Sequence, residues 1–403
     1  MTRLKWLLGA YMAFWSFVIG LATAAYLDCV NWVITFFWTY LPSVLHIPEQ
    51  WQPAIICLPL SLLIGLANYK IGPYPFTIGE VLGEVHVKGH FSAHRWWRIL
   101  IPGLLVLGAG ASVGPEASAS GLVAGMITWL GQRYKLVHAD WEHLSSARFT
   151  DQLKALWIER YDESKVDHPI TFYFKSERYK KFLYAIWTLF GIGGTAVFFT
   201  FFPQEGVFGF HTPTIHWQWQ GLIVVIPALI VGWLFGYVFV LVGKLARKWI
   251  APLGHSFIKA MIGGLLLVAA AAFSRDCLFS GEFTIVPLAH SALSMAPWFL
   301  LALALIKTLV TNVGFCLGWR GGTIFPSIFC SLASGAVLAQ FLPWMPLLTV
   351  SLVVASAITV ILDRPILTAV LICLLLPVQF SVFIVLACLL TKWVIQRFPV
   401  LKP

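Results

Sequence analysis

Apolar residues occur in long runs along this chain, separated by polar or Gly/Pro-rich segments. A helix needs about 20 apolar residues to cross the hydrocarbon core of a bilayer, and most of the runs approach or reach that length. They predict membrane helices at about residues 6–26, 29–45, 52–68, 98–112, 115–132, 182–202, 219–242, 256–274, 296–317, 323–341, 344–362 and 365–396. Because several runs are short or contain proline, we expect some tilted or incomplete helices. The pattern predicts an all-α polytopic membrane protein.

Two of the predicted membrane helices follow a Gly/Pro interruption inside an apolar stretch. The interruptions are ASVGPE at residues 111–116 and GGTIFP at residues 321–326. Pro115 and Pro326 suit the first turn of a helix, where the missing N–H costs nothing. Non-helical backbone survives in the membrane only where protein buries it or water reaches it. We therefore expect two helices that begin within the membrane and meet at one site.

The start of a buried helix favours a negatively charged ligand. Its first amides have no partner within the helix, and its dipole places about half a positive charge there. One broken helix in each half is typical of an inverted-repeat transporter with its site at the middle of the membrane. Thr323 offers a hydroxyl donor in addition to the amides. The candidate anion-binding residues are Gly114, Pro115, Glu116, Ala117, Gly321, Gly322, Thr323, Ile324, Phe325 and Pro326.

Glu116 allows two interpretations. In the first turn of a buried helix, its carboxylate could occupy the anion site as a tethered anion and leave when protonated or displaced, which makes Glu116 a candidate gate. A glutamate at this position also commonly caps its own helix. For Glu282 and Asp363, two other acids flanked by apolar runs, the sequence favours capping.

Composition narrows the class of protein. With 59% hydrophobic and 11% charged residues, and a mean hydropathy of +0.83, an ordinary soluble protein is excluded. The net charge of +10 would suit nucleic acid. The cations stand at the ends of apolar runs, however, as interfacial anchors do, so no nucleic-acid partner is expected. Seven cysteines are scattered without metal-ligand or disulfide spacing, and we expect neither a metal site nor a bound cofactor.

The chain is predicted to form a single transmembrane ion-transport domain over residues 1–403, with its N-terminus in the cytoplasm. Residues 133–181 are the one sizeable polar stretch and are expected to form a cytoplasmic or interfacial insertion within that domain. Leu153–Tyr161 has the pattern of an amphipathic helix at the membrane surface.

One predicted membrane helix, at residues 296–317, carries several polar residues: Lys307, Thr308, Thr311 and Asn312. Polar groups are costly at such depth, so a functional or helix-packing role is expected for them. Lys307 could alternatively extend its ammonium to the membrane interface.

At both interruptions the chain resembles the chloride channel (CLC) family of anion channels and anion/proton exchangers. Residues 307–326 are similar to the family's K…T…G…G…GGxFxP signature, with Ile324 in place of its usual phenylalanine. Val113-Gly114-Pro115-Glu116 looks like the family's glycine–proline element, and residues 364–369 resemble the start of its late helix.

The resemblance covers about residues 50–132 and 182–398. It implies a CLC-like inverted-repeat bundle with broken helices meeting at mid-membrane. It also implies a multi-pass protein of the cell membrane that transports a small inorganic anion, chloride, and forms homodimers in the lipid bilayer.

Two departures from the family bear on mechanism. The family's gating and proton-carrying glutamate corresponds here to Val113, which becomes an apolar lining and a second gate candidate. The family's anion-binding serine corresponds to Gly72. The departures favour channel-like or weakly proton-coupled movement of the anion. They leave open a non-conducting scaffold or assembly protein of the same fold.

Residues 110–114 also match the GxSxG motif of serine hydrolases, with Ser112 as the nucleophile, which raises an intramembrane hydrolase as a rival class. That motif follows a strand and needs histidine and acid partners, whereas a helix is predicted before it here. The sequence therefore favours a transporter that is not an enzyme.

Overall fold

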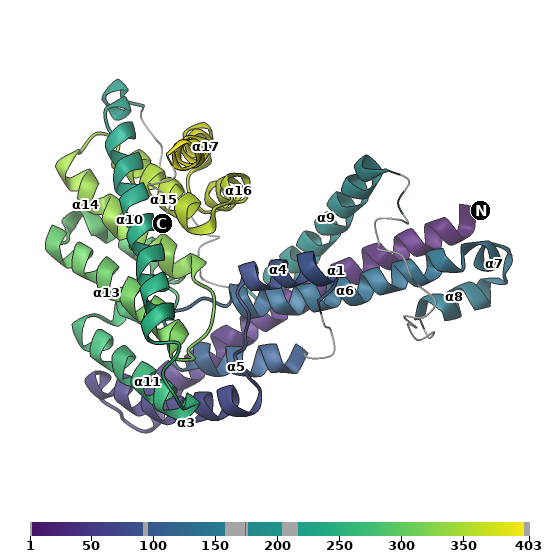
Figure 1. The fold of residues 1–403 in the computed structure, drawn as a ribbon, viewed down its shortest axis with the longest axis horizontal. Coiled ribbons are helices and arrows are strands. Elements are labelled where there is room, and N and C mark those ends of the chain that lie inside the picture. Colours follow the sequence, from purple (N-terminus) through teal and green to yellow (C-terminus); the bar gives the residue numbers. More distant parts are fainter. Residues whose placement is uncertain (1, 92–95, 158–173, 175, 204–216, 399–403) are drawn as a thin grey trace. The chain divides into compact units, whose positions relative to one another are not determined.

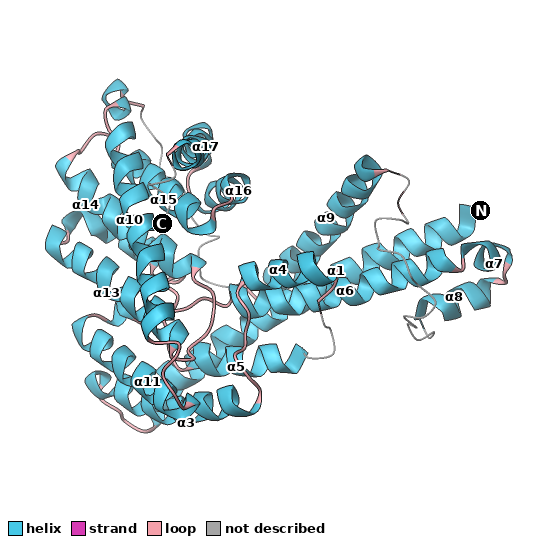
Figure 2. Ribbon diagram, in the orientation of Figure 1, coloured by secondary structure: helices cyan, strands magenta, loops and turns pink. Residues whose placement is uncertain are grey.

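The structure is a computed structural model that describes residues 2–91, 96–157, 174, 176–203 and 217–398 (Figure 1). Figure 2 shows that the described residues are overwhelmingly helical, and their only extended pairing is an isolated bridge between Gly114 and Gly322. By length and composition, eight helical segments in the described part could cross a membrane, and four more are apolar but shorter. The all-α polytopic class is confirmed.

The chain divides into two compact units, each built from separate stretches of sequence. Unit 1 comprises Met1–Trp32, Phe76–Leu100 and Ala117–Gln204. Unit 2 comprises Val33–Pro75, Ile101–Glu116 and Glu205–Pro403. The single transmembrane domain over residues 1–403 stays a prediction.

Unit 1 is built around a long N-terminal helix. Its helices are α1 (Thr2–Thr35), α4 (Ile78–Lys88), α7 (Trp141–Ser146), α8 (Phe149–Trp157), α9 (Glu177–Phe201), the start of α5 (Trp96–Gly108) and nearly all of α6 (Glu116–Ala139). Apolar side chains of α1 and α6, among them Leu8, Tyr11, Leu130 and Tyr134, form its core. Most of the apolar surface of α9 is uncovered, as expected for a helix that faces lipid.

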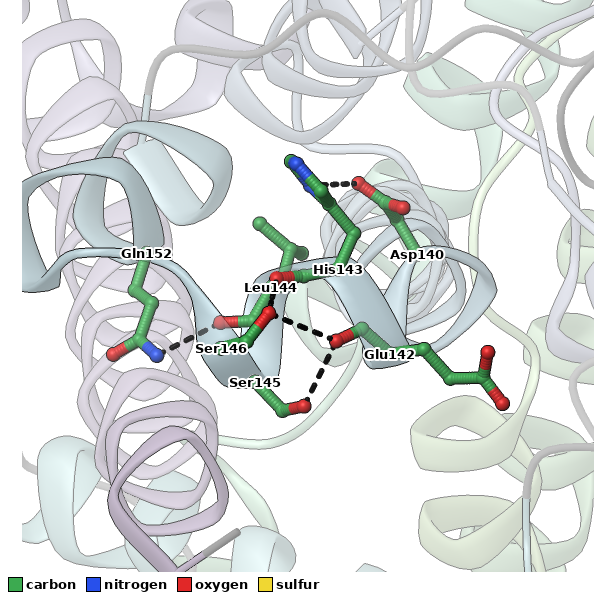
Figure 3. Close-up of polar contacts among 7 residues, drawn as sticks. All are labelled: Asp140, Glu142, His143, Leu144, Ser145, Ser146 and Gln152. Carbon is green, nitrogen blue, oxygen red and sulfur yellow. Dashed lines mark hydrogen bonds and ion pairs between the residues drawn. The ribbon is translucent and has the colours of Figure 1, made fainter.

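The described part of the polar stretch 133–181 contains the end of α6, then α7 and α8, and finally the first residues of α9. The side-chain amide of Gln152 donates to the carbonyl of Leu144, 2.8 Å away (Figure 3). Its oxygen accepts a hydrogen bond from Arg3 of α1 at 3.1 Å. The predicted amphipathic helix Leu153–Tyr161 corresponds to α8, and its last four residues lie outside the described residues.

Unit 2 contains the remaining helices. They are η1 (Phe36–Tyr40, a π-helix), α2 (Leu41–Val44), η2 (Glu49–Trp51), α3 (Gln52–Lys70), η7 (Trp219–Leu222), α10 (Val225–Trp249), α11 (Ser256–Phe273), η8 (Arg275–Cys277), α12 (Ile285–Ser291), η9 (Ala292–Ser294), α13 (Pro297–Cys316), α14 (Ile324–Phe341), α15 (Pro346–Leu362), α16 (Pro365–Leu375), η10 (Val378–Phe380) and α17 (Ser381–Arg397). Glycine lets them pack closely: Gly232 and Gly236 of α10 lie directly against the backbone of α15. Both Gly/Pro interruptions belong to this unit.

Two sequence expectations about helix boundaries are wrong. The predicted helices 6–26 and 29–45 are one continuous helical segment, because the single polar residue Asp28 does not interrupt the backbone hydrogen bonds of α1. The predicted run 365–396 is two helices, α16 and α17. Pro377 disfavours helical backbone at Leu376, which is extended and ends α16.

Candidate functional site

The first interruption separates α5 from α6. After Gly108 the chain leaves the helix, and Gly110 adopts a left-handed conformation with a φ of +80°. The indole of Trp38 fills the space beside Gly110 and donates its N–H to the carbonyl of Gly108 at 2.9 Å. A side chain at Gly110 would overlap that indole, so the turn needs glycine both for its φ and for its neighbour.

The second interruption separates α13 from α14. Gly318 also has a positive φ, +94°, and its carbonyl accepts from the side-chain amide of Asn68 at 3.0 Å. Trp319, which is fully buried, donates its indole N–H to the carbonyl of Ala260 on α11. A half-buried donor from α3 and a buried donor from the loop itself thus fix the non-helical backbone just before α14.

The two interruptions meet. Gly114 and Gly322 exchange two backbone hydrogen bonds of 2.8 Å each, forming a short antiparallel bridge. Neighbouring side chains fill the space left by both glycines of the second interruption. A Cβ on Gly321 would overlap Val113, and one on Gly322 would overlap the carboxyl group of Glu116. The structure therefore brings the helix starts together, as the sequence predicts.

The carboxyl group of Glu116 lies on the start of the opposite helix. Its Oε1 accepts from the backbone N–H of Ile324, the first residue of α14, at 2.9 Å. Its Oε2 is buried and has no hydrogen-bond partner among the described residues. The carboxylate thus occupies a position where helix amides favour negative charge.

This placement bears on the two interpretations of Glu116. A glutamate that only caps its own helix would contact the amides of α6, whereas Glu116 also bridges to α14. Glu282 lies on the turn before α12. Asp363 ends α15 and forms an ion pair with Lys392.

The other predicted residues take distinct places around the bridge. Val113 is buried against Gly321 and lines the contact. Thr323 precedes α14 but makes no capping hydrogen bond with its side chain. The remaining residues are all buried: Pro115, Ala117 and Pro326.

Ser112 is hydrogen-bonded to α13, not to a histidine. The Thr311 hydroxyl donates to the carbonyl of Ser112 at 2.9 Å, which uses its only proton. The Ser112 hydroxyl, 3.0 Å from that of Thr311, must therefore be the donor in the second contact. This pair links the first interruption to α13.

Two further polar residues support the second interruption, and both escaped the predictions from sequence. Asn68 and Arg320 were missed, although a cation directly before two glycines in an apolar run was a visible signal. Arg320 donates from Nε to the carbonyl of Pro75 at 3.2 Å and lies over the ring of Phe315. Lys307 was flagged, but the alternative that it extends to an interface is wrong, because protein buries it completely.

Comparison with known proteins identifies the class. Residues 176–396, over half of the chain, match the family described as voltage gated chloride channel. The chain therefore belongs to this family, the CLC family of membrane anion transport proteins.

Two relatives with names share limited identity with this chain. The "Putative ion-transport protein YfeO" of Escherichia fergusonii is 23% identical over 375 residues, covering 85% of this chain and 82% of that protein. The protein of the same name from Escherichia coli O1:K1 / APEC is 32% identical over 124 residues, which is 28% of this chain and 29% of that protein.

Solved structures confirm the fold. A slow cyanobacterial Cl⁻/H⁺ antiporter matches with a TM-score of 0.67 at 17% identity, covering 96% of this chain and 94% of that one. A CLC-type fluoride/proton antiporter matches with a TM-score of 0.62 at 15% identity, covering 95% and 94%. The predicted CLC-like fold is confirmed.

Proposed function

We propose that this protein carries a small inorganic anion, chloride, across the cell membrane by a channel-like or weakly proton-coupled mechanism, with Glu116 as its gate. The observation that supports the proposal is the contact of the Glu116 carboxylate with the first amide of α14. A carboxylate in that position competes with a free anion for the same donors. Anion passage then requires the side chain to leave.

Two events can displace the carboxylate. A rising anion concentration displaces it by competition, and protonation weakens it because a neutral carboxyl group is a poorer acceptor for helix amides. Val113 offers no acidic group at the position of the family's proton-carrying glutamate. We therefore expect proton movement to be absent or only loosely tied to anion movement.

Three further parts of the proposal rest on the family or on the sequence. We propose that the protein is a homodimer, that its N-terminus is cytoplasmic, and that it is not an enzyme. The Ser112–Thr311 hydrogen bonds support a structural role for Ser112. Labelling by a serine-directed covalent probe that disappears in S112A would instead support the hydrolase.

The test is flux from liposomes that contain purified protein, with chloride efflux and proton flux recorded together. We expect wild-type efflux to rise as the pH falls, because Glu116 is then more often protonated. E116Q removes the tethered charge, so its efflux should equal or exceed that of wild type and should no longer depend on pH.

E177Q is the matched control. Glu177 is also a first-turn glutamate, of α9, but its side chain is 68% exposed. E177Q should behave like wild type. A pH-dependent E116Q would contradict the gate. Proton movement in a fixed ratio to chloride movement would contradict the weakly coupled mechanism. No measurable flux of any halide would favour a non-conducting scaffold protein.

A further inference from the structure

Lys307 is a buried cation that the proposed mechanism does not use. It lies in the middle of α13 with none of its surface exposed. Its Nζ donates to the carbonyls of Asp276 at 2.6 Å, Leu278 at 2.9 Å and Phe279 at 2.9 Å. It also lies over the ring of Phe329, 4.9 Å from the centroid.

The three carbonyl partners establish the charge of this group. A neutral amine has two N–H groups and a lone pair, and the lone pair would repel a third carbonyl oxygen. Only an ammonium ion has three N–H donors, so Lys307 is charged. Within the described ranges, no carboxylate lies at ion-pair distance from its Nζ. A buried charge without such a partner is costly, which favours a function that needs it.

Hydrogen bonds connect Lys307 to the first interruption. The carbonyl of Phe279 accepts from Lys307, and the N–H of Phe279 donates to the carbonyl of Gly110 at 3.0 Å. Thr311 lies four residues later on the same face of α13 and holds Ser112. Helix α13 thus fixes the first interruption at two points, and Lys307 controls one of them.

We infer that Lys307 is a positioning and charge-selecting residue of the anion site: it holds the first interruption in place and supplies the fixed positive charge by which the site retains anions and rejects cations. The inference rests on the proposed function and adds the residue that sets charge selectivity. The transported species is then required to be negative, whatever its chemical identity.

The test compares K307M with K307R in liposomes, by the half-saturating chloride concentration and the anion-over-cation selectivity from reversal potentials. K307M should raise the half-saturating concentration at least about tenfold and lower the selectivity, since a charge in a low-dielectric interior acts strongly on its neighbours. K307R keeps the charge and its donors and should stay within about threefold of wild type.

K259M is the matched control, because Lys259 also donates from Nζ to a backbone carbonyl, that of Ala251, but at an exposed position. It should leave both readouts unchanged. Should K307M fail to fold, K307Q keeps two donors without charge and carries the same test.

The outcomes separate this inference from the proposed function. A folded K307M or K307Q with wild-type affinity and selectivity would overturn the inference while E116Q still tests the gate. If neither K307M nor K307Q folds while K307R is normal, Lys307 only stabilises the fold. That result would also overturn the inference. Wild-type protein that carries no anion would instead remove the proposed function.

Discussion

Gly321 and Gly322 have no side chains, and the side chains of two other residues occupy the space beside them. The side chain of Val113 packs over Gly321, and the carboxyl group of Glu116 lies over Gly322. Because the obstacle at Gly321 is a valine side chain, a second substitution can reduce it. At Gly322 the obstacle is the candidate gate itself.

G321A should lower the free energy of unfolding by about 1–3 kcal/mol, since the added methyl group overlaps Val113. V113A/G321A removes the closest overlap, with the Val113 Cγ2 methyl group, but keeps the overlap with the Cβ of residue 113, so only part of that loss should return. Thermal unfolding in detergent measures both variants. The control is G314A, because a Cβ on Gly314 makes only ordinary contact with Trp319. A double variant no more stable than G321A would contradict the packing described here.

At the residue scale, the sequence predicted the two interruptions that the structure brings together, but not all of their contacts. The glycines, prolines and Glu116 were identifiable because lipid offers no hydrogen-bond partners to an interrupted helix, so such an interruption stands out in an apolar sequence. The partner of Glu116 was not, because no local pattern pairs residue 116 with the amide of residue 324. The same holds for Asn68 and Gly318, which are joined only by the fold.

At the scale of elements, close packing of α1 and α9 depends on glycine in the same way. A side chain on Gly20 would overlap the carbonyl of Gly191, and one on Gly194 would overlap the carbonyl of Phe17. Backbone cannot move aside as a side chain can. Close contact of small residues is a common means of helix association where lipid supplies no hydrophobic driving force.

G194A should therefore destabilise unit 1 by about 1–3 kcal/mol, measured by thermal unfolding in detergent. G193A is the matched control one residue away, where a Cβ meets nothing within 4 Å. It should be neutral or slightly stabilising, because alanine favours a helix over glycine by up to about 1 kcal/mol. Equal loss in both variants would show that the α1–α9 contact is not what Gly194 provides.

Most helices were predictable from apolar runs, and the exceptions have physical causes. Asp28 did not end a helix because a long helix tolerates one polar residue, whereas Pro377 ended α16 because it lacks an amide and restricts its predecessor. The apolar pattern by itself does not tell whether such a residue interrupts a helix or is accommodated within it.

At the scale of the whole molecule, the family and the fold are established, and the transported ion is proposed. Membership in the voltage gated chloride channel family and the likeness to two antiporters define a multi-span membrane protein. The central claim is that the amides where the two interruptions meet bind an anion in the place taken by the Glu116 carboxylate.

The most direct measurement is anomalous X-ray scattering from E116Q crystals soaked in bromide. E116Q removes the competing charge, so the account predicts a bromide peak within hydrogen-bonding reach of the Ile324 amide, beside the Gly114–Gly322 bridge. In wild-type crystals at high pH the peak should be weaker. Crystals of E116Q with no bromide at these amides, or with bromide bound only elsewhere, would contradict the account.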